Sequence, residues 1–181
     1  MSVNSEHELR GSIWEQLQEA VTSREHTWRT PVLASVDGQG LPQARTVVLR
    51  EVDAVNRRLL IYTDHRSPKA VALASRPEAV LVFWSKALSW QLRVAVDVRI
   101  ETGGRLVEEA WDRICRTAAA VDYLSPQAPG SPIQFESTES ADEHALGIII
   151  ARVRRIDWLE LSAQGHRRAL LTDDDFQWLA P

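Results

Sequence analysis

The sequence predicts a mainly β protein, a mostly antiparallel barrel with a few helices packed on its outside. After residue 28, apolar residues recur with a period of two, which is typical of strands that bury one face. Short segments rich in Gly, Asp and Pro separate these stretches at the spacing of β-hairpins. Helix signals are confined to three segments. We expect residues 1–181 to form one domain, in which residues 1–27 contribute a helix packed on the barrel.

The first helix is predicted close to the start of the chain. The tetrad Ser5-Glu6-His7-Glu8 fits a capping box, in which a Ser hydroxyl and a Glu carboxylate satisfy free backbone N–H groups. Apolar residues then recur every four positions up to about residue 25, at Leu9, Ile13, Leu17 and Val21. This spacing predicts an amphipathic helix with one buried face.

Three strands are predicted next. Residues 31–36 and 43–52 are expected to pair as a hairpin, because the turn signal Asp37-Gly38-Gln39-Gly40 joins two stretches of strand-like residues. Residues 59–63 form the third strand. The sheet is therefore expected to begin with neighbouring antiparallel strands.

A short helix and two more strands follow. Ser67 and Pro68 suit the N-cap and first positions of a helix that Pro77 ends. Residues 79–84 are apolar throughout, which predicts a strand buried on both faces. Residues 90–100 alternate most regularly, and one face of this strand is formed by Leu92, Val94, Val96, Val98 and Ile100.

The last third of the chain is predicted to hold one helix and three strands. After Gly103-Gly104 a helix is expected over residues 105–120, and a Pro-rich loop follows over 125–132. Residues 136–143 are polar, and their pattern favours neither helix nor strand. The strands are expected at residues 147–161, 167–172 and 176–179, with a turn at 163–166.

Composition excludes several classes of protein. A formal net charge of −4 and a hydrophobic content of 44% are typical of a soluble globular domain and argue against a nucleic-acid binder. Cys115 is the single cysteine, so an internal disulfide is impossible and a Cys-rich metal site is excluded. The five histidines lack the spacing of metal ligands, and we expect no metal. The sequence shows neither a signal peptide nor an apolar run of membrane length, which predicts a cytoplasmic location with no membrane partner.

The segment Tyr62–Lys69 carries the strongest signal for a binding site. A strand ends there and a capped helix begins within a few residues, and helix N-termini favour anions such as phosphate. Ser67 adds a hydroxyl, while Arg66 and Lys69 add charged donors. An ordinary surface helix with two solvated cations is the alternative interpretation. The chain contains neither a Gly-x-Ser-x-Gly elbow nor a Gly-rich nucleotide loop.

Two arginines flank an apolar stretch of the second strand. Arg45 and Arg50 are five residues apart, and an odd spacing places them on opposite faces of a regular strand, so at most one can enter a given pocket. Two solvent-facing arginines are an equally good interpretation. Gln91, polar at the start of a strongly alternating strand, is by itself typical of a barrel rim.

Taken together, these segments resemble the pyridoxamine 5′-phosphate oxidase family. The resemblance covers residues 30–181 and is greatest with the branch described as oxidase-related FMN-binding proteins. It implies an FMN-binding split β-barrel, an antiparallel Greek-key barrel, that forms a homodimer with two flavins at the subunit interface. The matching motifs, in order, are Arg45-Thr46-Val47-Val48-Leu49-Arg50, Tyr62-Thr63, Ser67-Pro68-Lys69-Ala70, Phe83-Trp84 and Gln91-Leu92-Arg93-Val94, followed by Trp158 and the Leu-Ala-Pro ending.

The same resemblance implies roles for individual residues. Arg45 and Lys69 would contact the FMN phosphate, with Ser67 in the same turn, and Arg50 would stand where the family has a lysine near the flavin. Gln127 would come from the partner subunit. The other residues expected at the cofactor are Thr46, Val47, Val48 and Leu49 along the isoalloxazine, Tyr62 and Thr63 at its flank, Gln91 and Gln127 at its polar edge, and Trp158 beside the ring system.

The sequence departs from the family pattern at three places. The family's phosphate turn reads Ser-Arg-Lys, whereas Pro68 stands in the middle here, and Arg66 is the candidate replacement for the missing arginine. Near the C-terminus, Arg167 alone matches the first residue of the substrate-binding Arg-x-His segment. The helix expected to hold a substrate phosphate begins Trp111-Asp112-Arg113, without the family's tyrosine.

These observations predict an FMN-dependent oxidoreductase that acts on a small molecule, and no catalytic side chain is assigned. A flavin carrier or sensor without turnover is the alternative, because substrate-binding residues are missing. Two further readings stay open. One is genuine pyridoxamine 5′-phosphate oxidation in an altered pocket, and the other is a barrel that holds haem or a deazaflavin instead of FMN.

Overall fold

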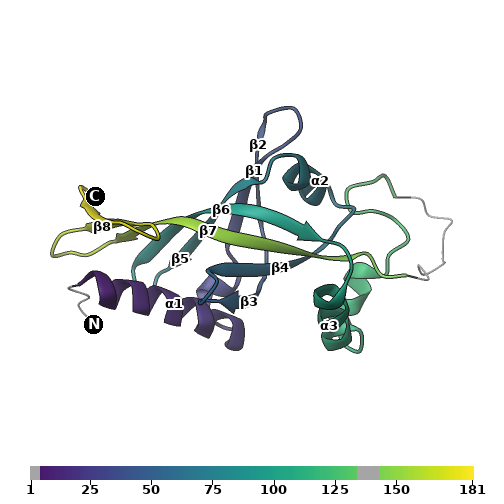
Figure 1. The fold of residues 1–181 in the computed structure, drawn as a ribbon, viewed down its shortest axis with the longest axis horizontal. Coiled ribbons are helices and arrows are strands. Elements are labelled where there is room, and N and C mark those ends of the chain that lie inside the picture. The colour runs from purple at the N-terminus through teal and green to yellow at the C-terminus, as the bar shows by residue number, and fades with distance from the viewer. Residues whose placement is uncertain (1–4, 134–142) are drawn as a thin grey trace.

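The computed structural model describes residues 5–133 and 143–181 and shows a curved antiparallel sheet flanked by helices (Figure 1). Seven strands lie in the order β2-β1-β5-β6-β7-β4-β3, and β8 and β9 extend the sheet from β7. The predicted antiparallel architecture is confirmed, although hydrogen bonds do not close the sheet. The strands are β1 (Val32–Val36), β2 (Pro42–Thr46), β3 (Leu49–Asp53), β4 (Arg58–Asp64), β5 (Glu78–Ser85), β6 (Trp90–Glu101), β7 (Leu146–Glu160), β8 (Arg167–Leu171) and β9 (Phe176–Leu179).

The two ends of the seven-strand order are close together in the chain. Only Val47 and Val48 separate β2 from β3, and three Cα–Cα steps span at most about 11 Å. The sheet must therefore curl until its ends approach. The predicted single strand over residues 43–52 is wrong, because at these two residues the chain leaves its partner β1 and crosses to pair with β4.

Helix α1 (Glu6–Thr22) packs against β3 and covers the core. Its capping box forms as predicted, since the Ser5 hydroxyl accepts from the Glu8 N–H at 3.3 Å and the Glu8 carboxylate accepts from the Ser5 N–H at 3.2 Å. The 3₁₀ turn η1 (Thr27–Arg29) then places Trp28 in the core. The buried side chains of α1 are Leu9, Ile13, Leu17 and Ala20.

Helix α3 (Arg105–Ile114) and the 3₁₀ segment η2 (Ala118–Tyr123) build a second apolar cluster on the far side of β4 and β7. The predicted helix over residues 105–120 is too long. The Thr117 hydroxyl and N–H both donate to the Ile114 carbonyl at 2.8 Å, which ends the α-helix before η2 begins. Helix α2 (Pro68–Ser75) lies against β1 and β6.

Strand β5 is buried on one face only, so the prediction that residues 79–84 are buried on both faces is wrong. Leu81 and Phe83 point into the core, while Val80 and Val82 are half-buried and Trp84 is 46% exposed on the outer face. The alternation predicted for β6 is confirmed. The buried residues of that face are Leu92, Val94, Val96 and Val98.

The segment 136–143, for which the sequence favours neither helix nor strand, lies outside the described residues except for Glu143. Among the helices that the structure describes, none combines the length and the apolar character needed to cross a membrane.

Gly147 on β7 is expected to resist substitution, whereas Gly11 in the exposed part of α1 is expected to tolerate it. A Cβ at Gly147 would lie 2.9 Å from the His65 Cβ and 3.3 Å from the Glu101 carbonyl oxygen, but a Cβ at Gly11 would meet nothing within 4 Å. Gly147→Ala should lower the free energy of unfolding by about 1–3 kcal/mol through overpacking. Gly11→Ala should raise it by roughly 0.5–1 kcal/mol through helix propensity. Urea titrations measure both, and equal effects of the two changes would contradict the close packing of β7 on the turn at His65.

Candidate functional site

The turn between β4 and α2 buries two hydroxyl groups side by side. Ser67 stands at the predicted N-cap position, but its hydroxyl makes no capping bond and instead donates to the Asp64 carbonyl at 2.7 Å. Thr63 Oγ1 lies 3.4 Å from Ser67 Oγ, and both residues are buried. Two buried hydroxyls therefore form a polar floor where α2 begins.

Lys69 borders these two hydroxyls, and the Arg45 charge is near enough to act on it. Lys69 Nζ donates to Ser67 Oγ at 3.3 Å, and Arg45, reaching over from β2, donates to Ser35 Oγ at 2.7 Å. Burial and the neighbouring Arg45 charge lower the pKa of Lys69, while Asp64 acts in the opposite direction. Desolvation also lowers the pKa of Arg45.

We call Arg45, Thr63, Ser67 and Lys69 the anion cluster. Among the described residues, neither of its cations forms an ion pair with a carboxylate. Two partly desolvated positive charges beside two hydroxyls make a site that is electrostatically complementary to a phosphate-like group.

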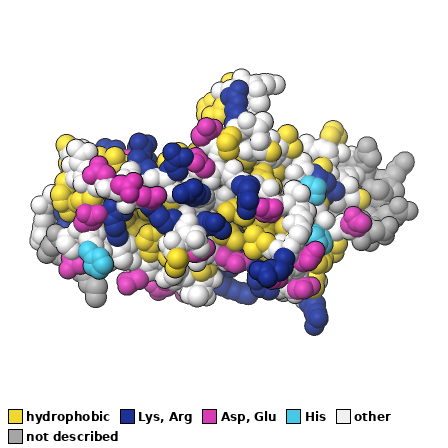
Figure 2. Space-filling model, viewed as in Figure 1, with side chains coloured by type: hydrophobic (Ala, Val, Ile, Leu, Met, Phe, Trp, Pro, Cys, Tyr) yellow, Lys and Arg dark blue, Asp and Glu magenta, His cyan; other side chains and the backbone are white. Residues whose placement is uncertain are grey.

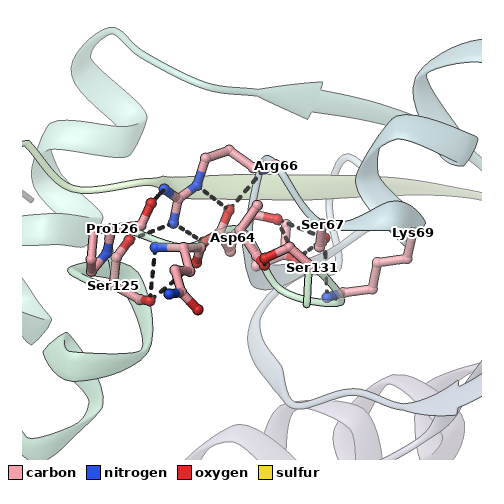
Figure 3. Close-up of polar contacts among 10 residues, drawn as sticks. Asp64, Arg66, Ser67, Lys69, Ser125, Pro126 and Ser131 are labelled. Carbon is pink, nitrogen blue, oxygen red and sulfur yellow. Dashed lines mark hydrogen bonds and ion pairs between the residues drawn. The ribbon is translucent and has the colours of Figure 1, made fainter. Parts of the chain in front are cut away.

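Arg66 does not join the anion cluster. Its guanidinium donates to the Asp64 carboxylate at 2.6 and 3.1 Å and to the Ser125 carbonyl at 2.8 Å. Figure 3 shows Arg66 directed toward Ser125 and Pro126, with Lys69 on the opposite side of Asp64. Arg66, the candidate replacement for the missing arginine, is thus hydrogen-bonded to other partners.

A second polar cluster lies on the opposite face of β4. The Tyr62 hydroxyl donates to Glu51 Oε1 at 2.6 Å, and Arg113 from α3 donates to the same oxygen at 2.6 Å and to the Tyr62 hydroxyl at 2.9 Å. Burial and the Glu51 hydrogen bond raise the pKa of Tyr62 to about 12. The Arg50 guanidinium carbon stands 5.7 Å from the centre of the Tyr62 ring. Arg50 and Tyr62 therefore gather on the α3 side, away from Arg45 and Lys69.

The residues between Arg45 and Arg50 serve mainly to anchor the chain crossing. The side chains of Val47 and Leu49 are buried in the core, and the Val47 N–H donates to the Pro31 carbonyl at 2.9 Å. Thr46 is exposed and Val48 is half-buried. If residues 46–49 contact a ligand, they do so through their backbone or through the side chains of Thr46 and Val48.

Gln91 and Trp158 lie far along the sheet from Thr63 within one chain. Gln91 is paired with Leu159, the neighbour of Trp158, whereas Thr63 is paired with Gly147. Gly147 and Trp158 are eleven residues apart on β7, which is about 35 Å of strand. Trp158 itself is fully buried, with its ring packed edge-on against Trp90.

Gln127 and Arg167 occupy two further places. Gln127 lies in the loop after η2, where its N–H donates to Ser125 Oγ at 3.2 Å, and this loop is the one that Arg66 contacts. Arg167 on β8 donates to Glu160 at 2.7 Å and stands over the Trp158 ring. The structure thus groups the expected site residues into separate regions of the chain.

Sequence reasoning missed Glu51, Asp64 and Arg113. Glu51 and Arg113 carry no local motif, because their contact joins β3 to α3 across sixty-two positions of the sequence. Asp64 carried a local sequence signal, because an Asp side chain in a turn can accept a hydrogen bond from the backbone N–H two residues later. The Arg66 N–H does donate to Asp64 Oδ1 at 2.8 Å. Among the described residues, the anion cluster is the arrangement best suited to binding a charged ligand.

Comparison with known proteins identifies a family. Residues 11–102 match the model of the FMN-binding domain of pyridoxamine 5′-phosphate oxidase. The pyridoxine/pyridoxamine 5′-phosphate oxidase of Chromohalobacter salexigens is 39% identical over 79 residues, which is 44% of this chain and 35% of that protein. The enzyme of the same name from Burkholderia thailandensis is 30% identical over 155 residues, or 85% of this chain and 64% of that one. The chain therefore matches less than two thirds of the length of these relatives.

Solved structures with the same fold cover nearly the whole chain. A pyridoxamine 5′-phosphate oxidase-related, FMN-binding protein from Nostoc punctiforme superposes with a TM-score of 0.75 at 24% identity, covering 100% of both chains. PhzG from Burkholderia lata, solved with tetrahydrophenazine-1-carboxylic acid, superposes with a TM-score of 0.72 at 15% identity, covering 98% of this chain and 94% of that one.

Proposed function

Because this chain belongs to the pyridoxamine 5′-phosphate oxidase FMN-binding family, we propose that it binds FMN and places the phosphate at the anion cluster. The observation that carries this proposal is the convergence of Arg45 and Lys69 beside the buried hydroxyls of Thr63 and Ser67. A phosphate monoester carries about −1.5 to −2 charges near neutral pH. It would supply the negative charge that these two cations lack, so the residues present fit the group.

The remaining motif residues would hold the rest of the cofactor. Backbone groups of the crossing at residues 46–49 would run along the isoalloxazine, and Arg50 and Tyr62 would approach it from the α3 side. FMN, when bound, supplies the hydride and single-electron chemistry of a flavin. The protein's part is to anchor the phosphate, orient the ring and set the charge around it, and no side chain is assigned to proton transfer.

A second copy of the chain is proposed to complete the site. Gln91 and Trp158 are about 35 Å of strand away from the level of Thr63, so one chain alone does not bring all motif residues to one flavin. The outer face of β5 and β6 carries a groove of 830 Å³ whose lining includes Val80, Ala95 and Arg155. Figure 2 shows basic and acidic side chains interspersed with hydrophobic ones on one face of the molecule. In an isologous homodimer contact the same patch of both copies is buried, and we propose that this groove is part of that patch.

The substrate is proposed to be a small molecule oxidised or reduced by the flavin. The relatives are named for vitamin B6 phosphate oxidation, while PhzG was solved in complex with a phenazine compound, so proteins of this fold bind different small molecules. In this chain Arg167 is bonded to Glu160 and Arg113 to Glu51. Two cations that could serve a substrate phosphate are thus already paired, which supports a substrate other than pyridoxamine 5′-phosphate.

Replacing Lys69 tests the phosphate position. Lys69→Ala should weaken FMN binding by about 2–5 kcal/mol, a factor of roughly 30 to several thousand, because a partly buried phosphate partner is lost. Riboflavin, which lacks the phosphate, should bind both proteins equally. Flavin fluorescence titration measures both affinities, and Lys86→Ala is the matched control.

The same titration has an expected pH dependence. FMN affinity should fall as pH rises through the lowered pKa of Lys69, since phosphate pairs with the protonated amine, and Lys69→Ala should remove this fall. A wild-type protein that binds no FMN would overturn the proposed function.

Turnover distinguishes an oxidoreductase from a flavin carrier. The holoprotein is expected to catalyse many cycles, in which an organic substrate or a nicotinamide reduces the flavin and oxygen reoxidises it. Steady-state absorbance measurements monitor this turnover. Pyridoxal 5′-phosphate formation from pyridoxamine 5′-phosphate is assayed in parallel. Reduction that stops after one equivalent per flavin with every donor would favour the carrier.

A charge placed in the outer groove tests the homodimer. Val80→Glu should dissociate the dimer, because an unpaired carboxylate would be buried in the contact, and FMN affinity should fall with it. Val55→Glu, at a turn residue that is 92% exposed, is the matched control and should leave the assembly intact. Sedimentation velocity measures both, and a wild-type monomer that binds FMN at full affinity would contradict the shared site.

A further inference from the structure

A buried carboxylate and one arginine hold the turn before α2 in place. Asp64 is 5% exposed, and a carboxylate at that depth needs charged or hydrogen-bonding partners. Arg66, two residues after Asp64, supplies these partners. Its backbone N–H donates to the carboxylate at 2.8 Å, and its guanidinium donates at 2.6 and 3.1 Å. These bonds satisfy the carboxylate and fix the direction of the guanidinium.

The same guanidinium ties down a distant loop. Arg66 Nη2 donates to the Ser125 carbonyl at 2.8 Å and Nη1 to the Pro126 carbonyl at 3.4 Å. The Ser125 hydroxyl in turn donates to the Gln127 carbonyl at 3.0 Å. One side chain therefore bridges residues that are about sixty positions apart (Figure 3).

The loop also packs on the first residue of α2. A Cβ added at Gly130, whose φ is +85°, would lie 3.2 Å from Pro68 Cγ, so the backbone of the loop runs directly over the proline ring. Pro68 stands where the family motif has an arginine. In this chain that position thus supports the loop, and the neighbouring Arg66 is turned toward the loop as well.

We propose that Arg66 is a positioning residue, which with Asp64 clamps residues 125–130 onto the phosphate turn and so places Gln127 for contact with a flavin at the subunit interface. This inference rests on the proposed function, and it assigns Arg66 no contact with the phosphate. The planar guanidinium, with five donors, can bond a carboxylate and two carbonyls at once, whereas an ammonium group cannot reproduce that fork. The clamp therefore requires arginine, not merely a positive charge.

The two roles predict opposite results for Asp64→Asn. If Arg66 were a phosphate ligand, the Asp64 charge would oppose phosphate binding, and its removal would tighten FMN binding. If Arg66 is a clamp, Asp64→Asn loosens the loop and weakens binding. The clamp predicts that Arg66→Lys and Arg66→Ala each weaken FMN and riboflavin by the same factor, about tenfold or more for the loss of charge-assisted hydrogen bonds. Asp64→Asn should weaken the binding of riboflavin as well as of FMN.

The experiment measures FMN and riboflavin affinity for these variants, with Lys69→Ala as the reference for a phosphate ligand. Gln127→Ala adds a double-mutant cycle, in which Arg66→Lys should have little further effect because the contact it positions is already gone. An FMN-selective loss in Arg66→Ala, full affinity in Arg66→Lys, or tighter FMN binding in Asp64→Asn would each overturn the clamp.

Hydrogen exchange of the loop separates this inference from the proposed function. The amides of Ser125, Gln127, Ala128 and Gly130 should exchange faster in Arg66→Lys than in the wild type, with no flavin present. If the wild-type protein binds neither flavin, the proposed function fails while the exchange result still decides the clamp. If these amides exchange at the same rate in Arg66→Lys as in the wild type, the clamp is overturned.

Discussion

The arrangement of this molecule depends on the short crossing from β2 to β3. Because Val47 and Val48 alone join the two ends of the seven-strand order, the sheet cannot lie flat, and the buried side chains of Val47 and Leu49 hold the crossing in the core. On one side of the crossing Arg45 bonds Ser35, where its charge acts on Lys69. The crossing sends Arg50 to the opposite side, beside Tyr62. Two polar regions with different partners thus follow from one steric constraint.

Asp64 balances charge in this region. Its burial is costly unless it is paired, and the bonds from Arg66 satisfy it. Its charge also acts on Lys69, where it counters the lowering of the pKa by burial and by Arg45. One carboxylate therefore stabilises the turn and favours the protonated form of the amine. Arg66 is bonded to this carboxylate, whereas Lys69 is bonded to Ser67.

The sequence was sufficient for the features that rest on local patterns. The capping box at Ser5 and the alternation of β6 appear as expected, because each depends on a few neighbouring residues. Arg45 and Arg50 do lie on opposite sides, but the break between β2 and β3 separates them, not an odd spacing within one strand. The break at Val47 and the exposed outer face of β5 did not follow from local patterns, since both depend on how strands distant in sequence are ordered. For the same reason the contact between Glu51 and Arg113 was not predicted. The direction of the Arg66 side chain was not predicted either, because its partners lie in a loop distant in sequence.

The scarcity of lysine makes the turn between β4 and α2 chemically distinguishable. Lys69 and Lys86 are the two lysines among twenty-one basic residues, and burial and the neighbouring Arg45 charge lower the pKa of Lys69. At a given pH it therefore holds more of its amine in the uncharged, nucleophilic form than an ordinary lysine does. An acylating reagent would compete with an anion for that nitrogen, so the extent of acylation at Lys69 relative to Lys86 becomes a direct readout of occupancy.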